Sequence, residues 1–216
     1  MNASLVQLVA EAASDPARGR IAGVVIGVVT NNSDPDGLGR VRVKFPWLSD
    51  ADESFWARIA APMAGNDRGV YFLPEIDDEV LVMFERGDVR FPYVIGSLWN
   101  GKDQAPASNA DGKNNLRVIK SRSGHLIKLN DEEGKETVEI IDSSGRNSIV
   151  IDTANNTITI TSGQDIVLAA PDGTIRLAAK KVEIESSADA TIKAGTGMDV
   201  SAAKTLNVAG STVNIN

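Results

Sequence analysis

An apolar-x-apolar pair returns about every eight residues through the C-terminal part of the chain. The pairs are Ile158/Ile160, Ile166/Leu168, Ile175/Leu177, Val182/Ile184, Ala190/Ile192, Met198/Val200, Leu206/Val208 and Val213/Ile215. Between them lie Gly, Ala, Ser, Thr, Asn and Asp, residues that form turns at low steric cost. Alternate residues of a strand face the same side, so both apolar members of a pair share one face. A fixed short repeat of this kind is typical of a solenoid or a fibre.

One chain could wind this repeat into a coil of three octads per turn, but that coil would have only about two and a half turns and two open ends. Three identical chains around one axis close the faces, share one core and remove the lateral strand edges. We therefore predict an intertwined triple-stranded β-helix over residues 116–216, and a single-chain solenoid is the alternative. The trimer core is predicted to contain Ile166, Leu168, Ile175, Leu177, Val182, Ile184, Ile192, Val200, Leu206 and Val208.

The chain before this region has a different texture. Residues 21–100 contain five strand-like stretches (21–30, 39–45, 55–63, 79–85 and 91–98) separated by segments rich in Gly, Asp, Asn and Pro. This spacing favours a small closed barrel such as the five-stranded OB-fold. Residues 101–115 are polar and predict a linker. Residues 1–20 carry a weak amphipathic-helix pattern in Leu5, Val6, Leu8 and Val9, so the chain is expected to be all-β apart from this segment.

Composition narrows the classes of function. The 216 residues carry a net charge of −7 and include no cysteine, which excludes a disulfide framework and thiolate metal sites. An acidic protein is a poor partner for nucleic-acid phosphates. The first residues lack the pattern of a secretory signal, so we expect a soluble protein made in the cytoplasm.

The residues that could carry chemistry have simpler structural roles. His125 has no neighbouring nucleophile or paired carboxylates to complete a catalytic set. The "DPDG" stretch (34–37) lacks the later ligands of a calcium loop and predicts a turn. Arg40, Arg42 and Lys44 alternate along one strand and would suit an oligonucleotide-binding face, the best rival interpretation. We expect no enzyme, no cofactor and no bound metal.

Three longer stretches carry a family resemblance. They are "VIGVVTNNSDPDGLGRVRVKFPWL" (25–48), "SFWARIAAPMAGNDRGVYFLPEIDDEVLVMFERGDVRFPYVIGSLWNG" (54–101) and "SRSGHLIKLNDEEGKETVEIIDSSGRNSIVID" (121–152). They resemble the central spike proteins of contractile injection machines: baseplate assembly protein V of contractile-tailed phages, the spike of T-even phages and the valine–glycine-repeat G proteins of type VI secretion. In that family an OB-fold precedes a three-stranded β-helical needle, and the spike is a homotrimer.

The resemblance implies a non-enzymatic, membrane-piercing spike at the centre of a baseplate, assembled into a phage tail-like particle. Residues 100–115 leave no room for the lysozyme domain of the T-even spike. Only about 20 residues precede the barrel, where type VI relatives carry a hub. A separate hub protein is therefore expected, with Leu5, Val6, Leu8 and Val9 as its contact.

The C-terminus is expected to receive a separate tip protein. Some spikes of this family end in a metal apex held by histidines, whereas here no histidine follows His125. The resemblance therefore implies that Val213, Ile215 and Asn216 form a blunt platform for a tip protein of the PAAR-repeat type. The alternatives to the spike are an OB-fold nucleic-acid binder with a β-rich oligomerisation tail and a carbohydrate-active single-chain β-helix.

A pair of substitutions tests the predicted inward and outward faces. Val208→Asp should lower the thermal stability strongly, because three buried like charges would each cost several kcal/mol before repulsion. Asn207→Asp, on the opposite face, should change the melting temperature little. Equal melting temperatures for the two variants would show that the assignment of faces is wrong.

Overall fold

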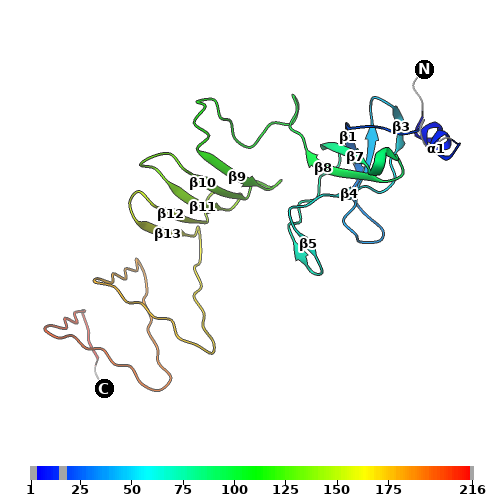
Figure 1. The fold of residues 1–216 in the computed structure, drawn as a ribbon. Coiled ribbons are helices and arrows are strands. Elements are labelled where there is room, and N and C mark those ends of the chain that lie inside the picture. The colour runs from blue at the N-terminus through cyan, green and yellow to red at the C-terminus, as the bar shows by residue number, and fades with distance from the viewer. Residues whose placement is uncertain (1–3, 15–18, 215–216) are drawn as a thin grey trace. The chain divides into compact units, whose positions relative to one another are not determined.

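The computed structural model describes residues 4–14 and 19–214 of the chain (Figure 1). Its contacts divide the chain into a unit that ends at Gly163 and a second unit that begins at Gln164. The first unit contains a short helix, a barrel-like sheet and a separate antiparallel meander. Apart from the helix and one 3₁₀ turn, η1 (Glu85–Gly87), the regular elements are β-strands, as the sequence predicts.

The N-terminal helix α1 (Leu5–Ser14) begins at a reciprocal cap. The hydroxyl of Ser4 accepts the amide of Gln7 at 3.2 Å, and the Gln7 side chain accepts the amide of Ser4 at 3.4 Å. This is a capping box, which pairs helix amides that have no partner within the helix. The Leu5 amide donates to Asp52 of the barrel at 3.0 Å. The apolar pattern at the start of the chain therefore does form a helix, and that helix is fastened to the barrel.

The barrel sheet has the strand order β3-β2-β1-β7-β8-β4. Its strands are β1 (Val24–Asn31), β2 (Arg42–Phe45), β3 (Ser49–Glu53), β4 (Arg58–Ile59), β7 (Glu79–Phe84) and β8 (Pro92–Ser97). There are six strands rather than the five expected. The segment Ser49–Glu53 was expected to be a turn, but its backbone pairs with β2, with Glu53 opposite Lys44. The ladder to β2 outweighs the low strand propensity of Asp and Ser.

The barrel core follows the alternation of these strands. Every second residue of β2 and β7 is buried, and the core is largely valine and phenylalanine: Val29, Val41, Val43, Phe45, Val80, Val82, Phe84, Val89 and Val94. The rings of Phe45 and Phe84 pack with centroids 5.6 Å apart. A Cβ atom at Gly27 would lie 3.3 Å from the Phe45 ring, so the glycine gives the ring its space. The barrel therefore buries an apolar core within one chain.

An ion pair between Asp34 and Arg40 organises the loop between β1 and β2. The Asp34 carboxylate accepts the backbone amides of Asp36, Leu38 and Arg40 at 3.0 to 3.3 Å. It also accepts two side-chain hydrogen bonds from Arg40, at 2.8 and 2.7 Å. The Arg40 hydrogen bonds, assisted by those amides, hold the pKa of Asp34 well below its usual range. The "DPDG" stretch is thus a turn, closed by an ion pair.

The second sheet is a five-stranded antiparallel meander, ordered β13-β12-β11-β10-β9. Its strands are β9 (Leu116–Lys120), β10 (Leu126–Asn130), β11 (Thr137–Ile141), β12 (Ser148–Asp152) and β13 (Thr157–Thr161). A polar residue at the end of each of three strands locks the following turn. The side chains of Asn130, Asp142 and Asp152 accept the amides of Glu132, Asn147 and Asn155, respectively. These turns fix the register of the meander.

The second unit has no regular element in its described part, 164–214 (Figure 1). Between residues 165 and 214 the backbone contributes one backbone–backbone hydrogen bond, from Gly173 to the carbonyl of Ala170 at 3.2 Å. Every residue from 164 to 214 is exposed. This segment therefore has no strand partner among the described residues of its own chain.

The ion pair between Asp34 and Arg40 leads to a stability prediction. Asp34→Asn should lower the melting temperature by several degrees, because the ion pair with Arg40 is lost while the side chain keeps its size. Since the folded-state pKa of Asp34 is depressed, its stabilisation is complete above the usual carboxyl pKa of about 4 and is lost as the pH falls below it. The gap between wild type and variant, followed by thermal unfolding from pH 7 to pH 2, should therefore close only in acid.

Asp36→Asn is the matched control for this variant. Asp36 is largely exposed and contacts only the outer side of Arg40, at 2.6 Å. Its replacement should leave the melting temperature nearly unchanged. If both variants melt together, Asp34 does not organise the loop.

Candidate functional site

The meander presents one continuous apolar face. Strand register aligns its side chains in two rows across the five strands. The first row is Ile119, Ile127, Ile140, Ile149 and Ile160. The second is Arg117, Leu129, Val138, Ile151 and Ile158. Apart from Arg117 these residues are all apolar and all exposed; Ile158 reaches 70%. A sheet face of this composition is normally buried against a core.

The opposite face of the meander is polar and better covered. Its middle row runs Val118, Lys128, Glu139, Val150 and Thr159. The Lys128 ammonium lies 2.8 Å from Glu139, and the hydroxyl of Thr137 donates to Glu139 at 2.7 Å. Burial raises the pKa of Glu139, but these hydrogen bonds outweigh it and the pKa lies below its usual value. The side chains of this ion pair are mostly covered, whereas the side chains of the isoleucine face are exposed.

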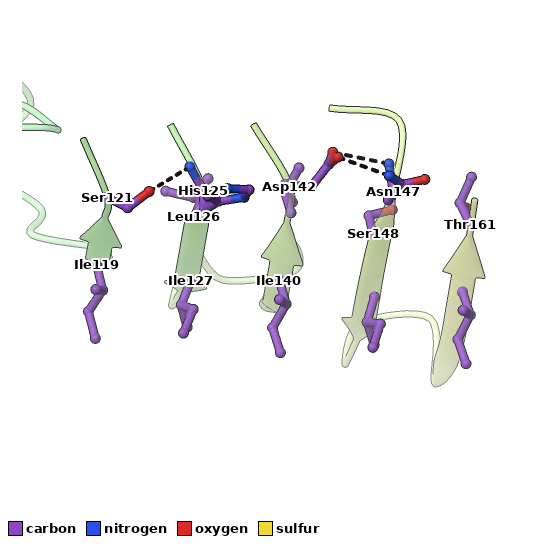
Figure 2. Close-up of a pocket in the computed structure, with 13 residues that line it drawn as sticks. Ile119, Ser121, His125, Leu126, Ile127, Ile140, Asp142, Asn147, Ser148 and Thr161 are labelled. Carbon is purple, nitrogen blue, oxygen red and sulfur yellow. Dashed lines mark hydrogen bonds between the residues drawn. The ribbon is translucent and has the colours of Figure 1, made fainter. Parts of the chain in front are cut away.

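Figure 2 shows the isoleucine side chains of neighbouring strands pointing to the same side. Together with residues at one end of the strands they line an open hollow of about 510 Å³. Seven of its thirteen lining residues are isoleucine or leucine, and the six polar ones lie in the turns and strand ends at that end. Such a hollow suits packing against other apolar side chains and offers little to orient a polar substrate.

The polar groups at this end are occupied in holding the turns. The Nδ1 atom of His125 accepts the backbone amide of Ser143 at 3.1 Å. The Ser121 hydroxyl accepts the backbone amide of His125 at 3.0 Å, and Asp142 accepts the side-chain amide of Asn147 at 2.9 Å (Figure 2). A histidine that serves a serine nucleophile would instead accept the hydroxyl proton. His125 therefore ties one turn to the next.

Two of the three basic residues at positions 40, 42 and 44 are also engaged. Arg40 is bound by Asp34 and Asp36, and the Arg42 guanidinium lies 3.2 Å from Glu53. Both guanidinium groups also lie over the ring of Trp56, at 5.8 and 4.9 Å from its centroid. An oligonucleotide would have to compete with these carboxylates and with the ring for both arginines.

The predicted core residues of the tail are uncovered in the single chain. Ile166, Leu168, Ile175, Leu177, Val182, Ile184, Ile192, Val200, Leu206 and Val208 are between 52% and 79% exposed. Of the predicted tip-docking residues, Val213 is exposed, whereas Ile215 and Asn216 lie outside the described residues. Sequence periodicity identified these residues, and the meander face continues the same apolar pattern upstream.

The residues predicted to contact a hub have different environments. Leu5 is buried in the barrel core, and Leu8 and Val9 pack against that core. Val6 points away from the core and is exposed. Of the four, Val6 therefore offers the largest surface to a partner.

Within residues 4–14 and 19–214 no group of three or more His, Cys, Asp or Glu side chains is arranged to hold a metal ion. In the same part of the chain no helix is both long and apolar enough to span a bilayer.

Comparison with known proteins places the barrel in a family. The model of the type VI secretion system/phage-baseplate injector OB domain matches residues 25–99. Residues 25–99 are therefore similar to this OB domain, and the chain is similar to type VI secretion spike proteins. It is 28% identical over 145 residues to the type VI secretion system spike protein VgrG1a of Pseudomonas aeruginosa, which covers 62% of this chain and 22% of that protein. Residues 1–99 make up less than half of the chain, whereas the match covers 62% of it. The similarity therefore extends beyond the OB domain.

Two further spike proteins give the same result. The chain is 32% identical over 99 residues to VgrG3 of Vibrio cholerae, covering 44% of this chain and 10% of that protein. It is 34% identical over 102 residues to VgrG2a of Pseudomonas aeruginosa, covering 45% and 12%. The chain thus matches between about a tenth and about a fifth of the length of these relatives.

The isoleucine face gives a direct test of whether it is covered in solution. Ile158→Asp should lower both the melting temperature and the oligomer mass, because burying a charged side chain against a partner costs free energy. Thr159→Asp is the control: it lies next in the same strand, is also exposed, and belongs to the opposite face. Thermal unfolding and light scattering should separate the two. Equal tolerance of both aspartates would mean that the face stays open to water.

Proposed function

We propose that this protein is the central, non-enzymatic spike of a contractile injection particle, acting as a homotrimer whose tail pierces the target envelope. The observation that carries the proposal is the uncovered apolar face of the meander together with the unpaired tail behind it. The family relationship supports a place in a baseplate. The absence of a free catalytic set around His125 is compatible with a mechanical role.

The trimer follows from what the chain leaves unsatisfied. Each large aliphatic side chain contributes roughly 1.5 to 3 kcal/mol on full burial, and the meander exposes nine of them on one face. Three copies of that face, turned toward a common axis, would form a closed prism with the Lys128–Glu139 pairs outside. Tail strands from the three chains would then pair with one another below it. Such a shaft supplies the missing ladders without free lateral edges.

The shaft has the dimensions and rigidity expected of a needle. Five meander strands followed by the later octads, at about 4.8 Å per strand layer, give a length on the order of 60 Å. Bending or fraying such a shaft would break many ladder hydrogen bonds and core contacts together. We infer that contraction of a surrounding sheath drives this shaft through a membrane.

Two partners complete the proposed assembly. The barrel and the exposed Val6 side of α1 would rest on a separate hub protein. At the other end, Val213, Ile215 and Asn216 of the three chains would present open strand edges to a tip protein of the PAAR-repeat type, which supplies its own strands.

Mass in solution tests the proposal. Light scattering should report three copies, about 69 kDa from the 22.9 kDa chain. Truncation after Asn115 removes the meander and the tail, and should give a smaller, weaker or absent oligomer while the barrel keeps its own core. A monodisperse full-length monomer would refute the spike.

A further inference from the structure

The barrel carries an arm that packs on none of its own core. Residues 60–72 leave β4, form the two-stranded hairpin β5 (Ala64–Gly65) and β6 (Arg68–Gly69), and return toward the barrel. In Figure 1 this hairpin projects away from the barrel sheet. Every residue from 60 to 72 is exposed, and Tyr71 and Phe72 are 76% and 67% exposed. Two adjacent aromatic residues in water are costly unless something covers them.

The arm and the barrel border an apolar hollow. Its volume is about 730 Å³, and its lining includes Leu38, Met63, Tyr71, Phe72 and Leu73. The Tyr71 ring also approaches the backbone near Gly39, where a Cβ atom would lie 3.5 Å from it. The Tyr71 ring at the base of the arm therefore lies beside the loop between β1 and β2.

A second apolar patch lies on the outer face of the same barrel. The residues of β1, β7 and β8 that face inward fill the core. The alternate residues of these strands face outward and should be polar. Instead Val24 lies opposite Met83, and Ile26 lies in the next row, opposite Leu81. Val24, Ile26 and Met83 are each between 43% and 48% exposed. We call the outer residues Val24, Ile26, Leu81 and Met83 the outer-sheet patch.

We propose that the arm of one barrel packs on the outer-sheet patch of the next copy of this chain, so that three barrels close into a ring. The inference rests on the trimer proposed above. A threefold ring is built from heterologous contacts, which require two different, complementary surfaces on every protomer. The barrel has such a pair: a projecting aromatic arm and a flat aliphatic sheet face.

The chain's own length favours a second copy as the occupant over an unrelated protein. Residues 98–115 join the last barrel strand to the meander, and even fully extended they span at most about 65 Å. Three barrels tethered to one shaft are thus held at effective concentrations on the order of millimolar. At such concentrations a modest apolar contact is enough to close the ring.

Cysteine crosslinking tests this contact cleanly because the chain has no cysteine of its own. The full-length protein carrying both Phe72→Cys and Ile26→Cys should give covalent dimers and trimers on a denaturing gel after treatment with a short bis-maleimide. Both positions are exposed, so the substitutions should leave the fold intact. Each single variant should remain monomeric on the gel, since two copies of one surface do not meet in a heterologous ring.

The control combines Phe72→Cys with Ala51→Cys. Ala51 is exposed on β3, at the far edge of the sheet from β8 and β4, and should give no covalent product. Light scattering on the same samples separates the two proposals. A trimer that does not crosslink through 72 and 26 would overturn the ring while the spike stands, and a monomer would overturn both.

A photo-crosslinker at position 72 checks the result without depending on cysteine spacing. In a sample mixed from isotope-labelled and unlabelled chains, mass spectrometry should find products that join a labelled arm to an unlabelled peptide of β1 or β7. Products confined to one isotope type, or joined to the meander, would contradict the ring.

Discussion

Backbone pairing within the single chain divides the structure into ordered sheets and a tail without strands. In the barrel and the meander each inner strand has partners on both sides, but residues 165–214 form no strand at all. Their amides and carbonyls can bond to water in an isolated chain, yet the apolar pairs between them then remain in water as well. Both deficits vanish together when strands of other copies lie alongside. The unpaired backbone and the uncovered side chains therefore express a single requirement.

The meander explains why the uncovered face is so consistently apolar. A slip of one residue in a strand would exchange its apolar face for the mixed residues of the other face, which include Lys128, Glu139 and Thr159. Turn residues prevent this: Asn130, Asp142 and Asp152 bind the amides of their own turns, and His125 links two turns at one end. Polar side chains at the rim thus control where the apolar ones point.

The sequence predicts those elements that are determined by their own local pattern of residues, and misses those that depend on contacts with distant residues or other chains. Alternation marked β1, β2, β7 and β8, but β3 was missed because its residues favour turns and only the ladder to β2 makes it a strand. The periodic pairs predict which tail residues share a face, yet the number of chains that covers them is no property of a local pattern. The aromatic arm was missed for the same reason, since "GNDRGVYF" reads only as a turn followed by a short apolar run.

The two units also imply an order of events. The barrel buries a valine and phenylalanine core within one chain, and α1 fastens to it through the Leu5–Asp52 hydrogen bond. It can therefore fold before any partner arrives. In the proposed trimer the tail would gain its ladders and its core only on association, so its folding would be an assembly step and its stability would depend on protomer concentration. Contacts between folded barrels would raise the local concentration of three tails and align their first strands. A ring of barrels would in this way promote the winding of the needle. The tail, which forms no strands alone, would then depend for its folding on the barrel, which has its own core.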